Sequence, residues 1–137
     1  MERIINRLLV LAAFFTLISC DEGGVLKSNT PGDVVKDMVE SIVDEDFGAF
    51  MALNINEKGK APSAKELEQT KAIMVFLKED IDEKGGLREV LIHEEKISED
   101  GLTAVVKVQL VYNDGKKAPE GNTELIKVDG VWKIKNL

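Results

Sequence analysis

Residues that usually carry chemistry are scarce in this chain of 137 residues, which holds one cysteine, one histidine, one tryptophan and one tyrosine. A single cysteine has no partner for a disulfide, so an apolar core must hold the fold. A single histidine without a second ligand falls short of a zinc site. The sequence also lacks a glycine-rich nucleotide loop, a serine elbow and a paired His–Glu motif. We therefore expect no metal, no cofactor and no recognisable catalytic residue.

The chain has no apolar run long enough to span a bilayer. Its most apolar segment, Leu8–Ile18, is much shorter than the roughly 20 residues that a membrane-spanning helix needs. Arg3 and Arg7 precede this segment and small residues lie near its end, a pattern typical of an export signal. The segment closes in Leu17-Ile18-Ser19-Cys20, which resembles the bacterial lipobox: two aliphatic residues, a small residue and the obligatory cysteine.

The resemblance to a lipobox implies lipidation at Cys20. The thiol would take a diacylglyceryl group, a peptidase would cleave after Ser19, and the new amine would usually receive a fatty acyl chain such as palmitate. We therefore expect a signal peptide over 1–19, a lipidated tether over 20–29 and a folded domain over 30–137. The expected location is the bacterial cell envelope, at the outer membrane or cell surface, with the inner membrane as the alternative. A secreted protein with a stray thiol and an uncleaved anchor are the other interpretations.

Acidic residues outnumber basic ones by 25 to 18, which gives a formal charge of −7. Removal of residues 1–19 would take away two arginines and one glutamate and leave a charge of −8. Such a surface repels nucleic-acid phosphates and anionic lipid headgroups, so we expect no nucleic-acid partner. Solubility is the simplest reason for the charge, and a basic protein partner is the alternative.

The folded part is predicted to open with a helix. Thr30 suits its N-cap and Pro31 its first position, because proline lacks an N–H that the first helical residue would leave unpaired. A second apolar stripe over 47–53 predicts one or two further helical turns, and 54–62 is predicted to be a polar loop. The residues expected on the buried face of the first helix are Val35, Met38, Val39, Ile42 and Val43.

A long helix is predicted after this loop. Ser63 and Glu66 match a capping box, in which each side chain pairs with the backbone N–H of the other residue. Gly85-Gly86 ends the helix, since glycine readily adopts the left-handed conformation found at helix ends. The residues expected to face the core are Leu67, Thr70, Met74, Leu77 and Ile81, with Ile73 and Phe76 widening the buried face.

After the long helix the apolar period changes from that of a helix to that of a strand. Asp129-Gly130 is a two-residue hairpin signal that sets the register of the last two strands. Helices on one side of a four-stranded antiparallel meander define an α+β domain. The predicted strands are 88–98, 102–112, 122–128 and 131–137. The opposed residues in the hairpin are Val128 with Val131, Lys127 with Trp132, Ile126 with Lys133, and Leu125 with Ile134.

Three phrases of the sequence resemble small bacterial lipoproteins with a nuclear transport factor 2-like (cystatin-like) domain of unknown function, of the DUF4878 type. "PGDVVKDMVESIVDEDFGAFMALN" resembles their first helices, "EKGGLREVLI" their helix-to-strand junction and "LIKVDGVWKI" their closing hairpin. One departure is Asp46, beside Glu45, where a glycine is expected before the acid–Phe pair. The resemblance spans roughly Thr30 to Leu137. It implies a cone: a strongly bent sheet wrapped over helices, with a pocket at the open end.

Four residues are candidates for a pocket or binding site, and each also has a plainer structural interpretation. His93 is an exposed or edge residue unless it binds a ligand or moves a proton. Tyr112 ends the inward face of its strand, so its hydroxyl reaches either a pocket mouth or the boundary of the core. Trp132 with Lys127 either clamps an acidic or aromatic ligand or packs across the hairpin. No inward-facing Asp or Glu stands out as a catalytic base.

The sequence predicts a membrane-tethered envelope lipoprotein whose domain binds a small ligand or a protein partner without catalysis. This hypothesis rests on the tether and on a pocket-forming fold without recognisable catalytic chemistry. A divergent enzyme of the isomerase or dehydratase type, using the cone pocket, is one alternative, since the wider superfamily includes such enzymes. An assembly role, in which the acidic face recognises a basic partner, is the other.

Overall fold

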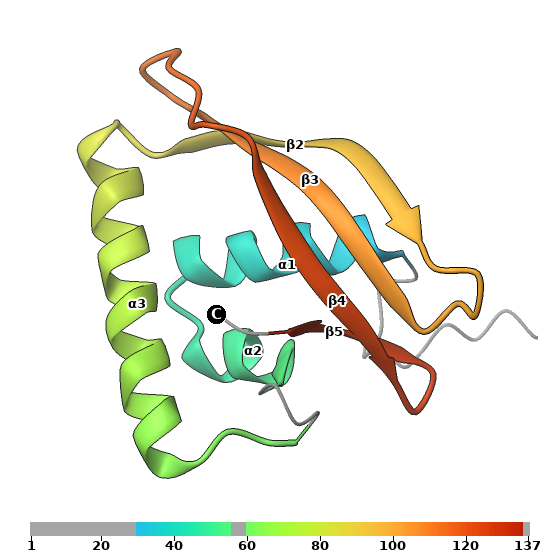
Figure 1. The fold of residues 1–137 in the computed structure, drawn as a ribbon. Helices are drawn as coiled ribbons and strands as arrows, with labels where there is room; N and C mark the ends of the chain where they lie inside the picture. Colours follow the sequence, from blue (N-terminus) through green and yellow to red (C-terminus); the bar gives the residue numbers. More distant parts are fainter. Residues whose placement is uncertain (1–29, 56–59, 136–137) are drawn as a thin grey trace, which may run out of the picture.

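The computed structural model describes residues 30–55 and 60–135, which form an α+β domain (Figure 1). The expected signal peptide, the tether and Cys20 lie outside the described residues. Three described helices precede the four long strands, as predicted. The elements in chain order are α1 (Pro31–Val43), α2 (Phe47–Ala52), β1 (Asn54–Ile55), α3 (Ala64–Glu83), β2 (Leu87–Ile97), β3 (Thr103–Tyr112), β4 (Gly121–Val128) and β5 (Val131–Lys135).

Each helix begins at a cap that its sequence supplies. The Thr30 side chain accepts a hydrogen bond from a backbone N–H in the first turn of α1, and Asp46 does the same for α2. Ser63 and Glu66 form the predicted capping box at the start of α3. These caps satisfy N–H groups that have no partner inside the helix. Within residues 30–55 and 60–135, no helix is both long and apolar enough to cross a membrane.

The described strands form one sheet in the order β1-β5-β4-β3-β2. Strands β2 to β5 are the predicted antiparallel meander, whereas β1 adds a fifth strand that pairs with β5 in parallel. The prediction of a loop over 54–62 is therefore wrong at Asn54 and Ile55. A strand of two residues is too short to show the alternation of apolar and polar residues that predicts a strand. Its pairing depends on a partner far along the chain: the Ile134 N–H donates to Leu53 O at 2.7 Å.

The register predicted for the closing hairpin is confirmed. All four opposed pairs form, from Val128 with Val131 to Leu125 with Ile134. Asp129 and Gly130 both have positive φ angles, of 50° and 79°, which is the conformation that a two-residue hairpin turn requires. The local chemistry of the turn is therefore sufficient to place Trp132 opposite Lys127.

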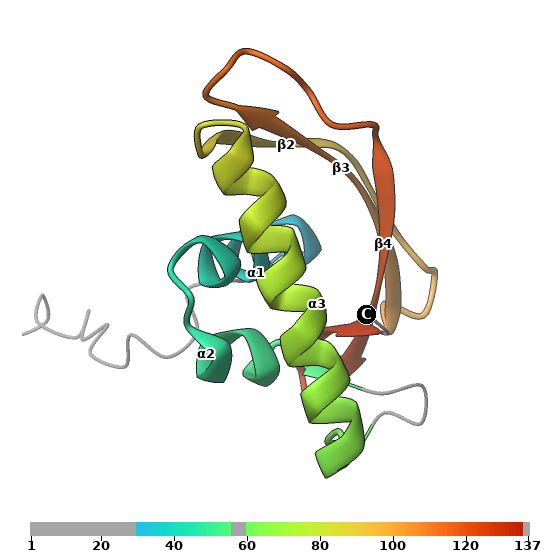
Figure 2. The same cartoon turned by 90° about the vertical axis from the view of Figure 1, so that its left-hand side faces the viewer.

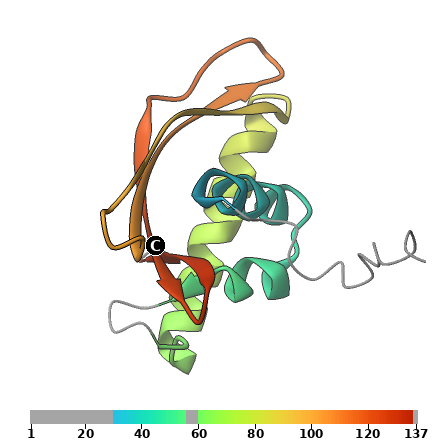
Figure 3. The same ribbon diagram turned by 90° about the vertical axis from the view of Figure 1, so that its right-hand side faces the viewer.

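The sheet curves around α1, which lies on its concave side together with α2 and α3 (Figures 2 and 3). Helix α1 packs against β2, β3 and β5 and against both other helices. The core is therefore centred on the apolar face of α1. Its buried residues are Val34, Val35, Met38, Val39, Ile42, Phe50, Met74, Ile81, Ala104, Val106, Tyr112, Leu125, Trp132 and Ile134.

The face of α3 that meets the core is narrower than predicted. Met74 and Ile81 are buried, but Phe76 is 68% exposed and Ile73 is 39% exposed. The prediction that Ile73 and Phe76 widen the buried face is therefore wrong. Helical spacing shows which residues share a face, whereas the width of the covered stripe depends on the partner surface, which here is α1 and α2.

The carboxylate of Glu95 links the sheet to α1. Glu95 is in register with the buried Val106, so it lies on the concave side, and its Oε1 accepts a hydrogen bond from the Gly32 N–H at 2.5 Å. Gly32 is buried at the second position of α1, where unpaired N–H groups and the helix dipole favour an anion. Glu95 thus lies on the concave side of the sheet but remains exposed, and its contact there is with the start of a helix.

We predict that Gly32→Ala lowers the free energy of unfolding by about 1–2 kcal/mol, measured by urea denaturation of the full chain. A Cβ at this position would overlap Glu95 Oε1 and displace the carboxylate from the helix terminus. In most helical positions the same substitution stabilises the protein by roughly 0.5–1 kcal/mol. A decrease in the free energy of unfolding would therefore indicate that the contact with Glu95 is lost.

Gly48→Ala is the matched control for Gly32→Ala. Gly48 also occupies the second position of a helix, α2, but a Cβ there would only meet Asp46 Oδ1 at 3.5 Å, an ordinary contact. We expect this variant to be unchanged or slightly stabilised. Equal shifts for the two variants would show that Glu95 does not constrain the start of α1.

Candidate functional site

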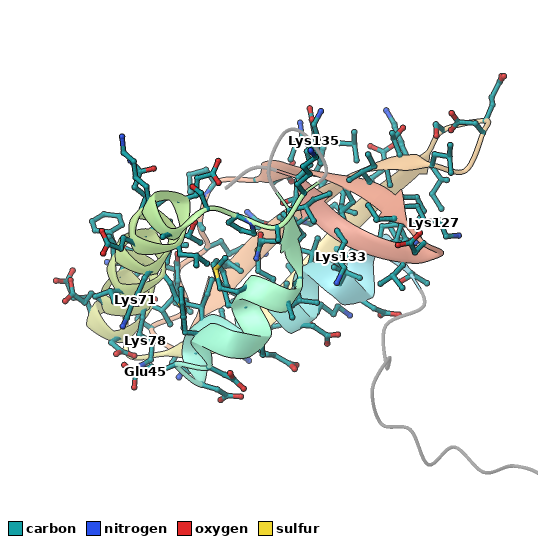
Figure 4. All side chains as sticks on the ribbon, turned by 90° about the horizontal axis from the view of Figure 1, so that it is seen from below. Glu45, Lys71, Lys78, Lys127, Lys133 and Lys135 are labelled. Atoms are coloured by element: carbon teal, nitrogen blue, oxygen red, sulfur yellow. The ribbon has the colours of Figure 1, made fainter. Side chains whose placement is uncertain are left out.

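A cavity of about 150 Å³ lies between the α1–α2 corner, the start of α2 and the middle of α3. Figure 4 shows three of its charged side chains, Glu45, Lys71 and Lys78, gathered beside α3 and apart from Lys127 and Lys133. The cavity is small compared with typical ligand sites of roughly 300–1,000 Å³, so it suits a small molecule. The lining residues are Glu45, Phe47, Lys71, Met74, Val75 and Lys78.

Four lining residues come from one stripe of α3. Lys71, Met74, Val75 and Lys78 have the spacing i, i+3, i+4 and i+7, which places them on one face of a helix. Met74 is buried in the core, whereas Val75 is half exposed. Two apolar side chains therefore lie between two lysines, and the Phe47 ring of α2 closes the apolar surface on the other side.

The two lysines of the cavity are held differently. Lys71 Nζ lies 5.7 Å from the centre of the Phe47 ring, within the range of a cation–π contact. Lys78 Nζ donates to both carboxylate oxygens of Asp82, at 2.6 and 2.7 Å. This hydrogen bond, helped by the negative charge of Glu45, raises the pKa of Lys78 above its ordinary value of 10.5. Lys78 is therefore a cation at neutral pH.

Glu45 occupies a strained position at the edge of the cavity. Helix α1 ends at Val43, and the chain turns into α2 with Glu45 at a φ of 56°, in the left-handed region. For a residue other than glycine this conformation costs about 1–2 kcal/mol. The turn is held by hydrogen bonds from the Asp46 N–H to Ser41 O (2.9 Å) and from the Glu45 N–H to Ile42 O (3.2 Å).

The structure places Tyr112 in the core rather than in a pocket mouth. Its side chain is 4% exposed, its hydroxyl donates to Asp80 Oδ2 at 3.4 Å, and Lys84 Nζ lies 4.7 Å above the ring. Lys84 also forms an ion pair with Asp80. Burial raises the pKa of Tyr112 above 10; Lys84 opposes this shift and Asp80 adds to it. This cluster joins the end of β3 to α3.

Trp132 and Lys127 pack together as cross-strand neighbours. Trp132 is 6% exposed, and Lys127 Nζ lies 5.3 Å from the centre of its ring. The interpretation of this pair as packing across the hairpin agrees with this geometry. Because the ring is buried in the protein's own core, it presents little surface to a ligand.

His93 lies on the convex side of the sheet. Its Nε2 is 3.0 Å from Gln109 Oε1 and therefore donates to it, while Gln109 Nε2 donates to Ala118 O at 2.9 Å. Glu120 Oε1 is 3.8 Å from the imidazole. These contacts attach the β3–β4 turn to the sheet. In the described part of the chain, no group of three or more His, Cys, Asp or Glu residues could hold a metal ion.

The four residues predicted for a site do not come together. Tyr112 is the last residue of β3, whereas Lys127 lies beside its start, where the Lys127 N–H donates to Leu102 O at 2.8 Å. The length of β3 puts about 30 Å between these ends. His93 is on the other face of the sheet, and none of the four lines the cavity between α2 and α3.

Residues 24–135 match the family model described as "Domain of unknown function (DUF4878)". The chain belongs to this family. The match covers all three helices and the whole sheet of the DUF4878 domain described above. No curated protein matches the sequence.

The DUF4878 domain is similar to several solved structures. A Campylobacter jejuni protein, provisionally assigned as an NTF2-like transpeptidase, superposes with a TM-score of 0.66 and 19% identity, covering 79% of this chain and 99% of that one. An NTF2-like protein of unknown function from Shewanella oneidensis superposes with a TM-score of 0.44 and 22% identity, and the alignment covers 74% of this chain and 88% of that one. The protein Aln2 from a Streptomyces species superposes with a TM-score of 0.43 and 16% identity, and the alignment covers 74% of this chain and 80% of that one. The first likeness confirms the expected NTF2-like fold.

Sequence reasoning missed the charged residues that line the cavity. The spacing of Lys71 and Lys78 could have placed them on one face of the third helix, with Met74 and Val75 between them. Nothing in the sequence indicates that this face of the DUF4878 domain would meet Phe47 and Glu45. That juxtaposition depends on how α3 packs across α2.

We predict that Tyr112, the only tyrosine, titrates above pH 10 in the folded DUF4878 domain. Because the folded pKa is raised above the unfolded value, the stability contributed by the neutral phenol is present below pH 10 and is lost as the pH rises through the folded pKa. Tyrosinate absorbance measures the pKa, and urea unfolding at increasing alkaline pH measures the stability.

Tyr112→Phe isolates this effect from the titration of lysines in the same pH range. Phenylalanine keeps the ring under Lys84 and removes the proton, so we expect a smaller loss of stability with rising pH in this variant. A folded pKa at or below 10 would show that the hydroxyl reaches water instead of the core.

Proposed function

We propose that this protein is a membrane-anchored lipoprotein of the bacterial cell envelope whose NTF2-like domain binds a small ligand in the cavity between α2 and α3. The observation that carries the proposal is the cavity itself, in which an apolar surface lies between two lysines. Such a surface complements a molecule with an apolar body and an anionic group. Binding by complementarity requires no catalytic group, and the domain acts as a receptor.

The lipobox sequence supports the anchor, and the cavity does not lie at the end of the domain where the tether joins it. A tether of ten residues, 20–29, reaches at most about 36 Å. Thr30 precedes the start of α1, while Glu45 follows its end, so the 13 residues of α1, about 20 Å long, separate the tether from the cavity (Figure 1). The cavity therefore lies at the opposite end of α1 from the residue that joins the tether.

We predict that Cys20→Ala abolishes labelling by a fatty-acid analogue and moves the protein from the detergent phase to the aqueous phase on phase partitioning. The thiol is the nucleophile that takes the lipid, so alanine leaves no site of attachment. Cys20→Ser controls for size and polarity and should behave in the same way. Unchanged labelling of either variant would exclude a lipid at residue 20.

We predict that 4-methylpentanoate binds saturably to the purified protein in detergent micelles, measured by equilibrium dialysis, and that Lys71→Met weakens binding about fivefold. Methionine keeps the length of the side chain and removes the cation that faces the carboxylate. An ion pair at an exposed rim contributes about 1 kcal/mol, which corresponds to this factor.

Lys65→Met is the matched control, because Lys65 lies on the same helix but outside the cavity. It changes the net charge of the protein equally and should leave binding unchanged. No saturable binding, or equal weakening by both variants, would contradict a ligand site between α2 and α3.

A protein partner is the second candidate, and the exposed apolar residues of α3 favour it. Phe76 and Ile73 lie one turn apart on the face of α3 that the core does not cover. Neither residue lines the cavity. Phe76→Ser distinguishes the two surfaces: it should weaken the binding of a protein partner and leave 4-methylpentanoate binding unchanged.

A further inference from the structure

Glu45 supplies the negative charge among the residues that line the cavity, and it does so from a left-handed position at the end of α1. Of the described residues with a positive φ, five are glycines and only Glu45 and Asp129 are not. Asp129 belongs to an Asp-Gly hairpin turn, which favours aspartate. Glu45 is the left-handed residue that ends α1: the Asp46 N–H donates to Ser41 O and the Glu45 N–H donates to Ile42 O, which is the pattern of a Schellman cap. Glycine is the usual residue at this position, so Glu45→Gly can remove the carboxylate without disturbing the corner.

The charges at the rim of the cavity are arranged as separate, opposite groups. Among residues 30–55 and 60–135, the Glu45 carboxylate makes no hydrogen bond or ion pair, and the Lys71 ammonium contacts only the Phe47 ring. Glu45 and Lys71 do not neutralise each other, although both line the same small cavity. A carboxylate that makes no direct bond but acts electrostatically on Lys78, and an ammonium that contacts an aromatic ring, therefore border one apolar surface.

We propose that the ligand of this cavity is an apolar zwitterion, such as a free aliphatic amino acid or a short apolar peptide. This inference rests on the proposed function and specifies its ligand. The Glu45 carboxylate receives the ammonium group of the ligand, Lys71 receives its carboxylate, and the apolar side chain lies on Met74, Val75 and Phe47. Lys78 also lines the cavity and is held in place by its ion pair with Asp82.

The test compares L-leucine with 4-methylpentanoate, which has the same carbon skeleton and carboxylate but no amine. Both are measured by equilibrium dialysis with the purified protein in micelles. Leucine should bind about fivefold more tightly, because it gains one ion pair at an exposed rim. Leucinamide, which lacks the carboxylate, should bind more weakly than leucine. Leucyl-leucine distinguishes a free amino acid from a short peptide as the ligand. If the dipeptide binds more tightly than leucine, the ligand is a peptide; if it binds more weakly, the ligand is a free amino acid.

Glu45→Gly tests the role of the strained residue directly. Glycine suits the backbone, so the unfolding midpoint should stay the same or rise, while the preference for leucine over 4-methylpentanoate disappears. Binding of 4-methylpentanoate should not weaken. Asp129→Gly is the matched control: it is the same kind of change at the other positive φ, it is distant from the cavity, and it should keep the preference for leucine.

The outcomes separate this inference from the proposed function. If 4-methylpentanoate binds and leucine binds no more tightly, the zwitterion is excluded while the ligand site stands. The same holds if Glu45→Gly keeps the preference for leucine. If neither compound binds saturably, both the ligand class and the cavity as a ligand site are overturned.

Discussion

The burial of α1 against the concave side of the sheet is the interaction on which the rest of the structure depends. The apolar face of this helix meets three strands and both other helices, and Val35 at its centre is completely buried. The chain has one cysteine, so no disulfide restricts the unfolded state, and the removal of apolar surface from water must offset the loss of chain entropy. The hydrogen bond from Gly32 to Glu95 fixes where α1 starts on the sheet.

The position of α1 also accounts for the candidate site. Because its last turn is buried, the chain must turn sharply at Glu45 to enter α2, and α3 then packs across both helices. The strain at Glu45 is tolerated because backbone hydrogen bonds from Glu45 and Asp46 hold the corner. Membership of the DUF4878 family and the NTF2-like fold do not specify a ligand, since this fold supports unrelated functions. The ligand hypothesis therefore rests on the side chains at this corner.

The scarcity of aromatic residues explains why the predicted site residues serve the fold. With one tyrosine and one tryptophan, the core uses both at opposite ends of the sheet, where each is covered by a lysine. Tyr112 joins β3 to α3 through Asp80, and Trp132 closes the last hairpin. A rare residue type attracts attention in a sequence, but in a domain of this size a large ring is also the most effective way to fill the core.

Local chemistry in the sequence determined the helix caps, the four long strands and the register around Asp129-Gly130, because each depends on a few neighbouring residues. Only the tertiary structure decided that Asn54 and Ile55 pair with β5, that Phe76 stays exposed and that Glu95 reaches Gly32. It also brought Glu45 and Lys71 into the lining of one cavity. These contacts join segments far apart in the chain. Periodicity reports the face on which a residue lies, but the packing of helices on a curved sheet decides what that face meets.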